Sequence, residues 1–479
     1  MDTPQTAYQN LKAHFPFQPT ADQEGLVREL SVYISTQKLH PSVFIIKGYA
    51  GTGKTTVLNS LVGAHRQGKR KIVLMAPTGR AAKVMSASAH YPAHTVHRTI
   101  YRPKVGASGL ATFSLSTNPL TNTTFIVDEA GLVGNKSDIG SNSLLEDILE
   151  FVFSNSNNSL ILMGDPAQLP PVGEEISPAL SEDYFNHIAG IPAKSIELKQ
   201  VVRQALDSTV LKNATALRNL ITSGSNDAPT LEPGPDIIRV EDGYQLQEIF
   251  EHMYSGSDSS QSTMVVRSNK KANGYNQGIR SRIKYHEDQI AAGDEIMVVK
   301  NNYFWLPEDS KMSFIANGEI ARIRSIRKIH ERYGFTFCEA TIDFVDTPAQ
   351  ESIDVLLNLS VLDSPGPSLS GPQSQEFYQK MLEKYAYLGS KKKIYEGIKC
   401  DPYYNALQVK FSYVITCHKA QGGQWDTVIV EHPYLPNGPS NIYSKWLYTA
   451  ITRAAKKVYL VGFPDEWFGP VSLEDKPES

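Results

Sequence analysis

The chain has 479 residues, of which 41% are hydrophobic and 20% charged, and its formal net charge is −3. This length exceeds one ordinary domain, and the composition is globular, which excludes a fibrous or wholly disordered chain. The nearly balanced charge also excludes attraction of a nucleic acid by overall charge, so any such partner must be held in a local channel.

The spacing of the cysteines and the lack of a long apolar run indicate where in the cell the protein is expected. The three cysteines, Cys338, Cys400 and Cys417, are far apart in sequence. Their spacing argues against a disulfide framework, a zinc site or an iron–sulfur site, and favours a reducing interior. The first residues lack a signal-peptide pattern, and no apolar run approaches the roughly 20 residues that a membrane span needs. We therefore expect a cytoplasmic protein that does not bind membranes.

The strongest motif is a glycine-rich loop in residues 43–59, VFIIKGYAGTGKTTVLN. The apolar run 43–46 predicts a buried parallel strand, and a helical pattern begins after the loop. Between them, GYAGTGKT matches the phosphate-loop pattern G-x-x-x-x-G-K-[ST]. Backbone N–H groups of such a loop surround phosphate oxygens, and the following helix points its positive end at them. The predicted nucleotide-binding residues are Gly48, Ala50, Gly51, Thr52, Gly53, Lys54, Thr55 and Thr56, with Lys54 at the β and γ phosphates and Thr55 at Mg²⁺.

Gln23 precedes this loop and allows two interpretations. Thr20 is a candidate helix N-cap, and Gln23 stands three positions later, as in a capping box. Alternatively, its side-chain amide binds the edges of an adenine base. The local sequence favours neither interpretation.

Three further apolar strands, at 72–75, 124–127 and 160–163, each end in small, polar or charged residues. The carboxyl ends of parallel strands meet at one edge of a sheet, which is where ligands bind. Asp128 and Glu129 follow the strand 124–127, so Asp128 is expected to hold Mg²⁺ and Glu129 to orient or deprotonate the attacking water. Gln168, in GDPAQLPP, is expected at the γ-phosphate.

The α/β alternation restarts near residue 195 and returns after residue 411, with a different region between these two parts. Residues 296–346 contain short strands separated by turns, which predicts a small barrel. Phosphoryl transfer to water commonly uses arginines from a second domain. Arg203 in VVRQ and Arg453 in AITRA are the candidates, because both fall in the second α/β region.

In order, the segments GYAGTGKT, APTGRAAK, AHTVH, VDEA, GDPAQLPP, VVRQ, YVITCHKAQGGQWD and YTAITRA resemble the helicase motifs of superfamily 1. The resemblance is greatest to the RecD-like and Dda-like group, which moves 5′→3′ on single-stranded DNA. It runs from about Thr20 to Val461. It implies two RecA-like domains with ATP between them, and places Gln23 at adenine, Gly422 at the nucleotide, and Gln168, Arg203 and Arg453 at the γ-phosphate. It places the following residues near the DNA backbone: Pro77, Thr78, His97, Thr416 and His418.

The expected domain limits follow from these motifs. The first RecA-like domain is expected at 1–192, with a hairpin insertion at 98–120 that carries the strand-separating pin. The second comprises 193–282 and 406–479, interrupted at 283–405 by an SH3-like β-barrel with a helical and linker extension. The segment 351–399 matches no known part of the family. The expected partners are single-stranded DNA and single/double-strand junctions, and the protein is expected to be a monomer.

Two other functions stay open at this point. One is a superfamily 1 translocase of the opposite, UvrD-like polarity, which the β-rich insertion argues against because those enzymes carry helical insertions. The other is a nucleotide-gated binding protein with little hydrolysis, which the complete set of Lys54, Asp128, Glu129, Arg203 and Arg453 argues against. The sequence does not separate DNA from RNA.

Overall fold

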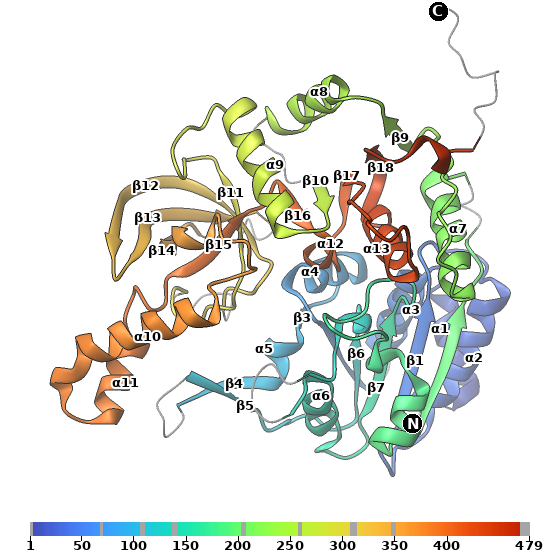
Figure 1. Cartoon of the computed structure of the whole chain (residues 1–479). Coiled ribbons are helices and arrows are strands. Elements are labelled where there is room, and N and C mark those ends of the chain that lie inside the picture. The colour runs from blue at the N-terminus through green and yellow to red at the C-terminus, as the bar shows by residue number, and fades with distance from the viewer. Residues whose placement is uncertain are drawn as a thin grey trace, which may run out of the picture.

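The computed structural model describes residues 3–67, 70–105, 111–136, 142–202, 207–256, 261–306, 314–345 and 351–469. Within these residues, two parallel sheets with flanking helices form two domains, and a barrel lies beside them (Figure 1). The two-domain α/β fold with a β-rich insertion is therefore confirmed. No helix in the described ranges is both long enough and apolar enough to cross a membrane.

The first sheet contains six parallel strands in the order β3-β2-β6-β7-β1-β8. Its central strands β6 and β7 are buried at every position, as expected for strands covered by helices on both faces. All strands run in the same direction, so their carboxyl ends share one edge, as predicted from the polar clusters. The strands are β1 (Val43–Gly48), β2 (Lys71–Ala76), β3 (Ala93–Thr95), β6 (Thr123–Val127), β7 (Ser159–Gly164) and β8 (Ala193–Leu198).

Helices pack on both faces of this sheet. Those described are α1 (Pro4–Ala13), α2 (Ala21–Ser35), α3 (Lys54–Gln67), α4 (Gly79–Ala89), α5 (Val96–Ile100) and α6 (Leu144–Phe153). Short helical turns follow the strands at η1 (Ala130–Leu132), η2 (Pro178–Leu180) and the π-helical η3 (Tyr184–Ala189).

Strand β8 corrects one predicted domain boundary. It pairs in parallel with β1 along its whole length, so it is the edge strand of the first sheet. Placing the start of the second domain at residue 193 was therefore wrong. Its sequence, AKSIEL, lacks a continuous apolar run, because an edge strand is only partly covered and most of its positions are only partly buried.

The second sheet contains five strands in the order β16-β10-β17-β18-β9. They are β9 (Ile237–Val240), β10 (Ser262–Val266), β16 (Val414–Thr416), β17 (Trp425–Glu431) and β18 (Ala454–Val461). The accompanying helices are α7 (Thr209–Ser223), α8 (Gly243–Tyr254), α9 (Asn269–Arg282), α12 (Cys417–Ala420), α13 (Asn441–Ile451) and η7 (Asp465–Trp467). Helices α7 and α13 lie over the first domain in Figure 1.

The region between β10 and β16 forms a closed barrel of five strands, which is compatible with the expected SH3-like insertion. Burial alternates along most of β13, the period of a strand with one face on a core. Ending the insertion at residue 405 was wrong, because β15 pairs with both β11 and β14 and so belongs to the barrel. The strands are β11 (Glu295–Val298), β12 (Ile320–Arg332), β13 (Phe335–Phe344), β14 (Ile353–Asn358) and β15 (Leu407–Phe411).

The segment 351–399, which the sequence left unplaced, supplies β14 and a helical pair. The pair consists of α10 (Gly371–Tyr385) and α11 (Lys391–Lys399), with short turns at η5 (Leu359–Val361) and η6 (Ala386–Leu388). Phe377 and Met381 of α10 and Ile398 of α11 pack with Phe335 and Phe337 of the barrel. These helices therefore cover one side of the barrel (Figure 1).

An antiparallel hairpin follows α5, where the sequence predicted an inserted hairpin or loop. Its strands are β4 (Tyr101–Val105) and β5 (Ala111–Leu115), paired from Tyr101 with Leu115 to Val105 with Ala111. The hairpin projects from the first domain on the side where the barrel lies (Figure 1). The side chain of Phe113 in β5 lies outside the described residues.

Candidate nucleotide site between the two domains

The phosphate loop has the strand–loop–helix context that its sequence predicted. β1 ends at Gly48 and α3 begins at Lys54. Gly53 has φ +86°, and a Cβ built there would lie 2.3 Å from Nε2 of Gln23, so the loop needs glycine at this position. The Thr52 hydroxyl, which is fully buried, donates to the carbonyl oxygen of Tyr49 at 2.8 Å and stabilises the turn.

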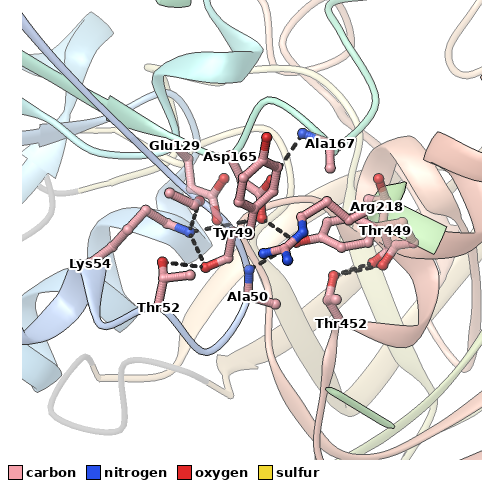
Figure 2. Close-up of polar contacts among 12 residues, drawn as sticks. Tyr49, Ala50, Thr52, Lys54, Glu129, Asp165, Ala167, Arg218, Thr449 and Thr452 are labelled. Atoms are coloured by element: carbon pink, nitrogen blue, oxygen red, sulfur yellow. Dashed lines mark hydrogen bonds and ion pairs between the residues drawn. The ribbon is translucent and has the colours of Figure 1, made fainter. Parts of the chain in front are cut away.

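The amino group of Lys54 is held inside the loop. It donates to the carbonyl oxygens of Gly48 and, at 3.2 Å, of Tyr49. It also lies 3.8 Å from Oδ2 of Asp165. Figure 2 shows Lys54, Glu129 and Asp165 pointing toward one another. The side chain that is predicted to bind phosphate therefore faces two carboxylates.

Gln23 makes both contacts of a capping box and a third contact to the loop. Its backbone N–H donates to Oγ1 of Thr20 and its Oε1 accepts from the Thr20 backbone N–H at 3.0 Å. Its Nε2 donates to the carbonyl oxygen of Thr52 at 3.1 Å, and the residue is fully buried. The capping interpretation is thus present in the structure, and Gln23 also supports the phosphate loop. Its contact with adenine stays a prediction.

Asp128 and Glu129 follow β6 at the same edge of the sheet. Burial, and next to it the charge of Glu129, raises the pKa of Asp128 to about 6. The Glu129 backbone N–H donates to Oδ1 of Asp128 at 2.8 Å. Glu129 has φ +51°, a left-handed conformation that is uncommon for a residue with a side chain and that concentrates at functional sites. The pair is therefore a partly desolvated carboxylate site, held in a strained turn.

Arg453 reaches this site from the second domain. It follows α13, and its guanidinium lies 3.8 Å from Oε1 of Glu129 with only 7% of the side chain exposed. Bonds to the carbonyl oxygens of Thr449 and Gly423 fix its direction. The structure thus brings Lys54, Glu129 and Arg453 together, and their catalytic roles stay predictions. Arg203 lies outside the described residues.

Gln168 and Asp165 lie on the loop after β7. Gln168 is 9% exposed and lines a small cavity of 220 Å³ together with Asp165 and Lys47. Asp165 accepts from the backbone N–H of Ala167 at 2.9 Å and from the hydroxyl of Tyr448 at 2.7 Å. Burial raises the pKa of Asp165, while Lys54 opposes the rise. Asp165 was not among the predicted site residues, although it stands next to the strand end in the same motif.

A second-domain loop lies on the N-terminus of α4, near two of the residues predicted to contact DNA. Thr78 caps α4, and its Oγ1 accepts from the Ala81 backbone N–H at 3.2 Å. A Cβ built on Gly422 would lie 2.7 Å from Cβ of Ala81 and 3.1 Å from Oγ1 of Thr78. Gly422 therefore packs between the domains, and its nucleotide contact stays a prediction. Arg80 of α4 stacks on the ring of Trp425 at 3.7 Å.

A groove of 490 Å³ separates α4 and β3 from the barrel. Its lining includes Lys83, His94 and Arg98 on the first domain and Phe314 and Glu319 on the barrel. Lys83 and Glu319 form an ion pair of 2.8 Å across it. Phe314 is 7% exposed and stacks on Tyr303, so the cations are the groove's candidate contacts for a nucleic-acid backbone.

The other residues that are predicted to contact DNA differ in how exposed they are to solvent. Pro77 and His97 are half-buried, and the His97 ring packs 5.5 Å from that of Tyr101 at the base of the hairpin. Thr416 is 8% exposed at the end of β16, whereas His418 is exposed on α12. Their contacts with DNA stay predictions.

Two protein-family models match the chain. Residues 24–227 match the model described as AAA domain, and residues 411–461 match the UvrD-like helicase C-terminal domain. An AAA domain match that contains the phosphate loop, followed by a helicase C-terminal domain match, is the arrangement that the superfamily 1 resemblance predicts. The barrel strands β11 to β14 lie between the two matches.

Two relatives are similar to the chain over most of its length. It is 22% identical over 94% of its length to the ATP-dependent RecD2 DNA helicase of Deinococcus radiodurans, of which it covers 51%. It is 23% identical over 88% of its length to the uncharacterized protein MJ1519 of Methanocaldococcus jannaschii, of which it covers 36%. The chain thus spans about half or less of the length of these relatives. The Bacteroides Pif1 helicase solved with ADP-AlF3 and single-stranded DNA is 14% identical, with 95% of each chain covered and a TM-score of 0.48.

Proposed function

We propose that the protein is an ATP-driven DNA helicase that moves 5′→3′ on single-stranded DNA and unwinds duplexes. The observation that carries the proposal is the approach of Arg453 to Glu129, 3.8 Å apart, across the boundary between the two domains. A catalytic site completed by a second domain makes hydrolysis depend on the relative position of the domains, and so links hydrolysis to movement.

The roles of the residues follow from their chemistry. Lys54 leaves the carbonyl oxygens of the loop to bind the β and γ phosphates, which are stronger acceptors because they are charged. Glu129 orients the attacking water and accepts its proton, and Gln168 contacts the γ-phosphate or that water. Arg453 neutralises the charge that develops on the transferred phosphoryl group.

Asp128 and Thr55 are the residues that would hold Mg²⁺. A carboxylate whose pKa is raised by burial gains most from a nearby cation, and carboxylate and hydroxyl oxygens are suitable ligands for this ion. Bound with ATP, the ion supplies neutralisation of phosphate charge. In the described ranges, no cluster of three or more metal-ligating side chains occurs, which fits an ion that takes most of its ligands from phosphate and water.

The groove between α4 and the barrel supports the nucleic-acid part of the proposal. Arg98 and Lys83, the latter paired with Glu319, place positive charge in its lining for a phosphate backbone. The hairpin β4–β5, our candidate for the strand-separating pin, projects on the same side (Figure 1). The direction of movement rests on the resemblance of the ordered motifs to the RecD-like and Dda-like group.

Two fork substrates test the proposal, one with only a 5′ single-stranded tail and one with only a 3′ tail. We expect ATP-dependent opening of the 5′-tailed fork, and no opening by Lys54→Ala. Deletion of the hairpin 101–118 should retain DNA-stimulated ATP hydrolysis but abolish strand separation. Preference for the 3′-tailed fork would contradict the polarity, and absence of ATP hydrolysis would contradict the function itself.

A further inference from the structure

Tyr448 is a buried residue of α13 whose hydroxyl contacts two parts of the first domain. The backbone N–H of Ala50, in the phosphate loop, donates to this hydroxyl at 2.8 Å. The hydroxyl in turn donates to Oδ2 of Asp165 at 2.7 Å. The side chain is 0% exposed, so both bonds are shielded from water.

The chemical state of this hydroxyl is fixed by its surroundings. Burial and the adjacent Asp165 carboxylate raise the pKa of Tyr448 well above its ordinary value. The phenol therefore stays protonated and donates to Asp165, which itself lies 3.8 Å from the amino group of Lys54. One hydroxyl thus joins the phosphate-loop backbone, the carboxylate beside Lys54, and a helix of the second domain.

Packing alone does not require a hydroxyl at this position. Tyr443 lies on the same helix and is 2% exposed, and its hydroxyl has no hydrogen-bond partner among the described residues. Helix α13 therefore accommodates a buried tyrosine without such bonds. Tyr448 differs because both of its bonds cross to the first domain.

Neighbouring contacts of α13 explain why this link matters. One residue further on, Oγ1 of Thr449 accepts from the Leu169 backbone N–H at 2.9 Å. Five residues after Tyr448, Arg453 reaches Glu129. The hydroxyl thus fixes the phosphate loop to the helix from whose end the arginine projects.

We propose that Tyr448 is a positioning residue that keeps the phosphate loop and Asp165 in register with α13, so that Arg453 meets Glu129 only when the two domains are correctly apposed. The inference rests on the proposed ATP hydrolysis, since the register matters only if Arg453 acts there. Tyr448 itself touches neither water nor phosphate in this role.

The test compares Tyr448→Phe with Tyr443→Phe in the full chain. Each variant removes one buried hydroxyl from the same helix and retains the ring. We expect Tyr448→Phe to lower kcat for ATP hydrolysis on single-stranded oligo-dT by about tenfold or more, as for loss of a bond to a charged group. KM for ATP should stay within about twofold, because the phosphate-binding groups remain. Tyr443→Phe should match the wild type in both parameters.

A double-mutant cycle of Tyr448→Phe with Asp165→Ala, which removes the acceptor of this bond, supplies a second test. The losses in kcat should be strongly non-additive, because both substitutions break one shared bond. Wild-type kcat in Tyr448→Phe, or additive losses, would overturn the inference while leaving the proposed function in place. Thermal unfolding measures the fraction of folded protein. If kcat falls only in proportion to this fraction, Tyr448 acts as a packing residue and the inference is overturned. An inactive wild type would instead contradict the proposed function.

Discussion

Replacing Asp128 with asparagine should stabilise the protein when no Mg²⁺ or nucleotide is present. Burial and Glu129 raise the pKa of Asp128 from an ordinary 3.8 to about 6. The difference is about two pH units, and one unit corresponds to about 1.4 kcal/mol, so the ionised carboxylate costs up to about 3 kcal/mol in the folded state. Asparagine removes this charge and retains an oxygen that accepts from the Glu129 backbone N–H.

The sign of the pH dependence follows from the direction of the shift. The folded state holds the Asp128 proton more tightly than the unfolded state, so the cost is complete above about pH 6. It declines as the pH falls from about 6 toward 4, and it vanishes below about pH 4, where both states are protonated. The advantage of Asp128→Asn over the wild type should follow the same course.

Denaturant unfolding at pH 8, 6 and 4, without divalent ions, measures this difference. Asp183→Asn is the control, because the side chain of Asp183 is 94% exposed and its charge is solvated. Adding Mg²⁺ with ADP should then stabilise the wild type more than Asp128→Asn. Equal or lower stability of Asp128→Asn at pH 8 would refute the argument that this carboxylate is kept at the site at the expense of the fold.

Two further predictions concern the loop and the domain boundary. Gly53→Ala places a Cβ 2.3 Å from Nε2 of Gln23 at φ +86°, so binding of a fluorescent ADP analogue should weaken at least about tenfold. Gly278→Ala in α9, where a Cβ meets nothing within 4 Å, is the control and should bind normally. Normal binding by Gly53→Ala would contradict the loop geometry. Arg453→Ala should lower ATP hydrolysis about 100-fold and retain oligo-dT binding. Lys456→Ala, which removes an exposed ion pair with Asp426, is the control and should leave both unchanged. DNA-stimulated hydrolysis at the wild-type rate in Arg453→Ala would count against the two-domain site.

The sequence predicted the parts of the site that local order determines. Strand, loop and helix are contiguous around Lys54, and Asp128 directly follows a fully buried strand, so both positions follow from short-range patterns. Arg453 was found because it stands in a recognisable motif at the end of a helix. Each of these residues lies at the end of one regular element, which a periodic pattern can locate.

The remaining features depend on contacts between distant segments. The bond of Tyr448 to Asp165 joins residues 283 positions apart, and it forms only when one domain packs on the other. The edge strand β8 carries a weak apolar pattern, and the short apolar run of β14, IDVLLN, does not by itself distinguish a strand from a helix, so their sheets became apparent only from their pairing. For Gln23, the local sequence predicted the capping box with Thr20, but it did not predict the bond to the carbonyl oxygen of Thr52 in the phosphate loop.

Only two residues separate the last barrel strand β15 from β16 of the second sheet. The second of them, Tyr413, receives a bond from the Glu295 backbone N–H through its hydroxyl and bonds from Met264 and Tyr254 through its carbonyl oxygen. Because this two-residue connection is short and hydrogen-bonded, we expect the barrel to move as one rigid body with the second domain. A rotation that opens the nucleotide cleft would therefore swing the barrel across α4 and break the ion pair of Lys83 with Glu319. A strand lying in the groove would be clamped and released by that swing, with no change of shape inside the barrel.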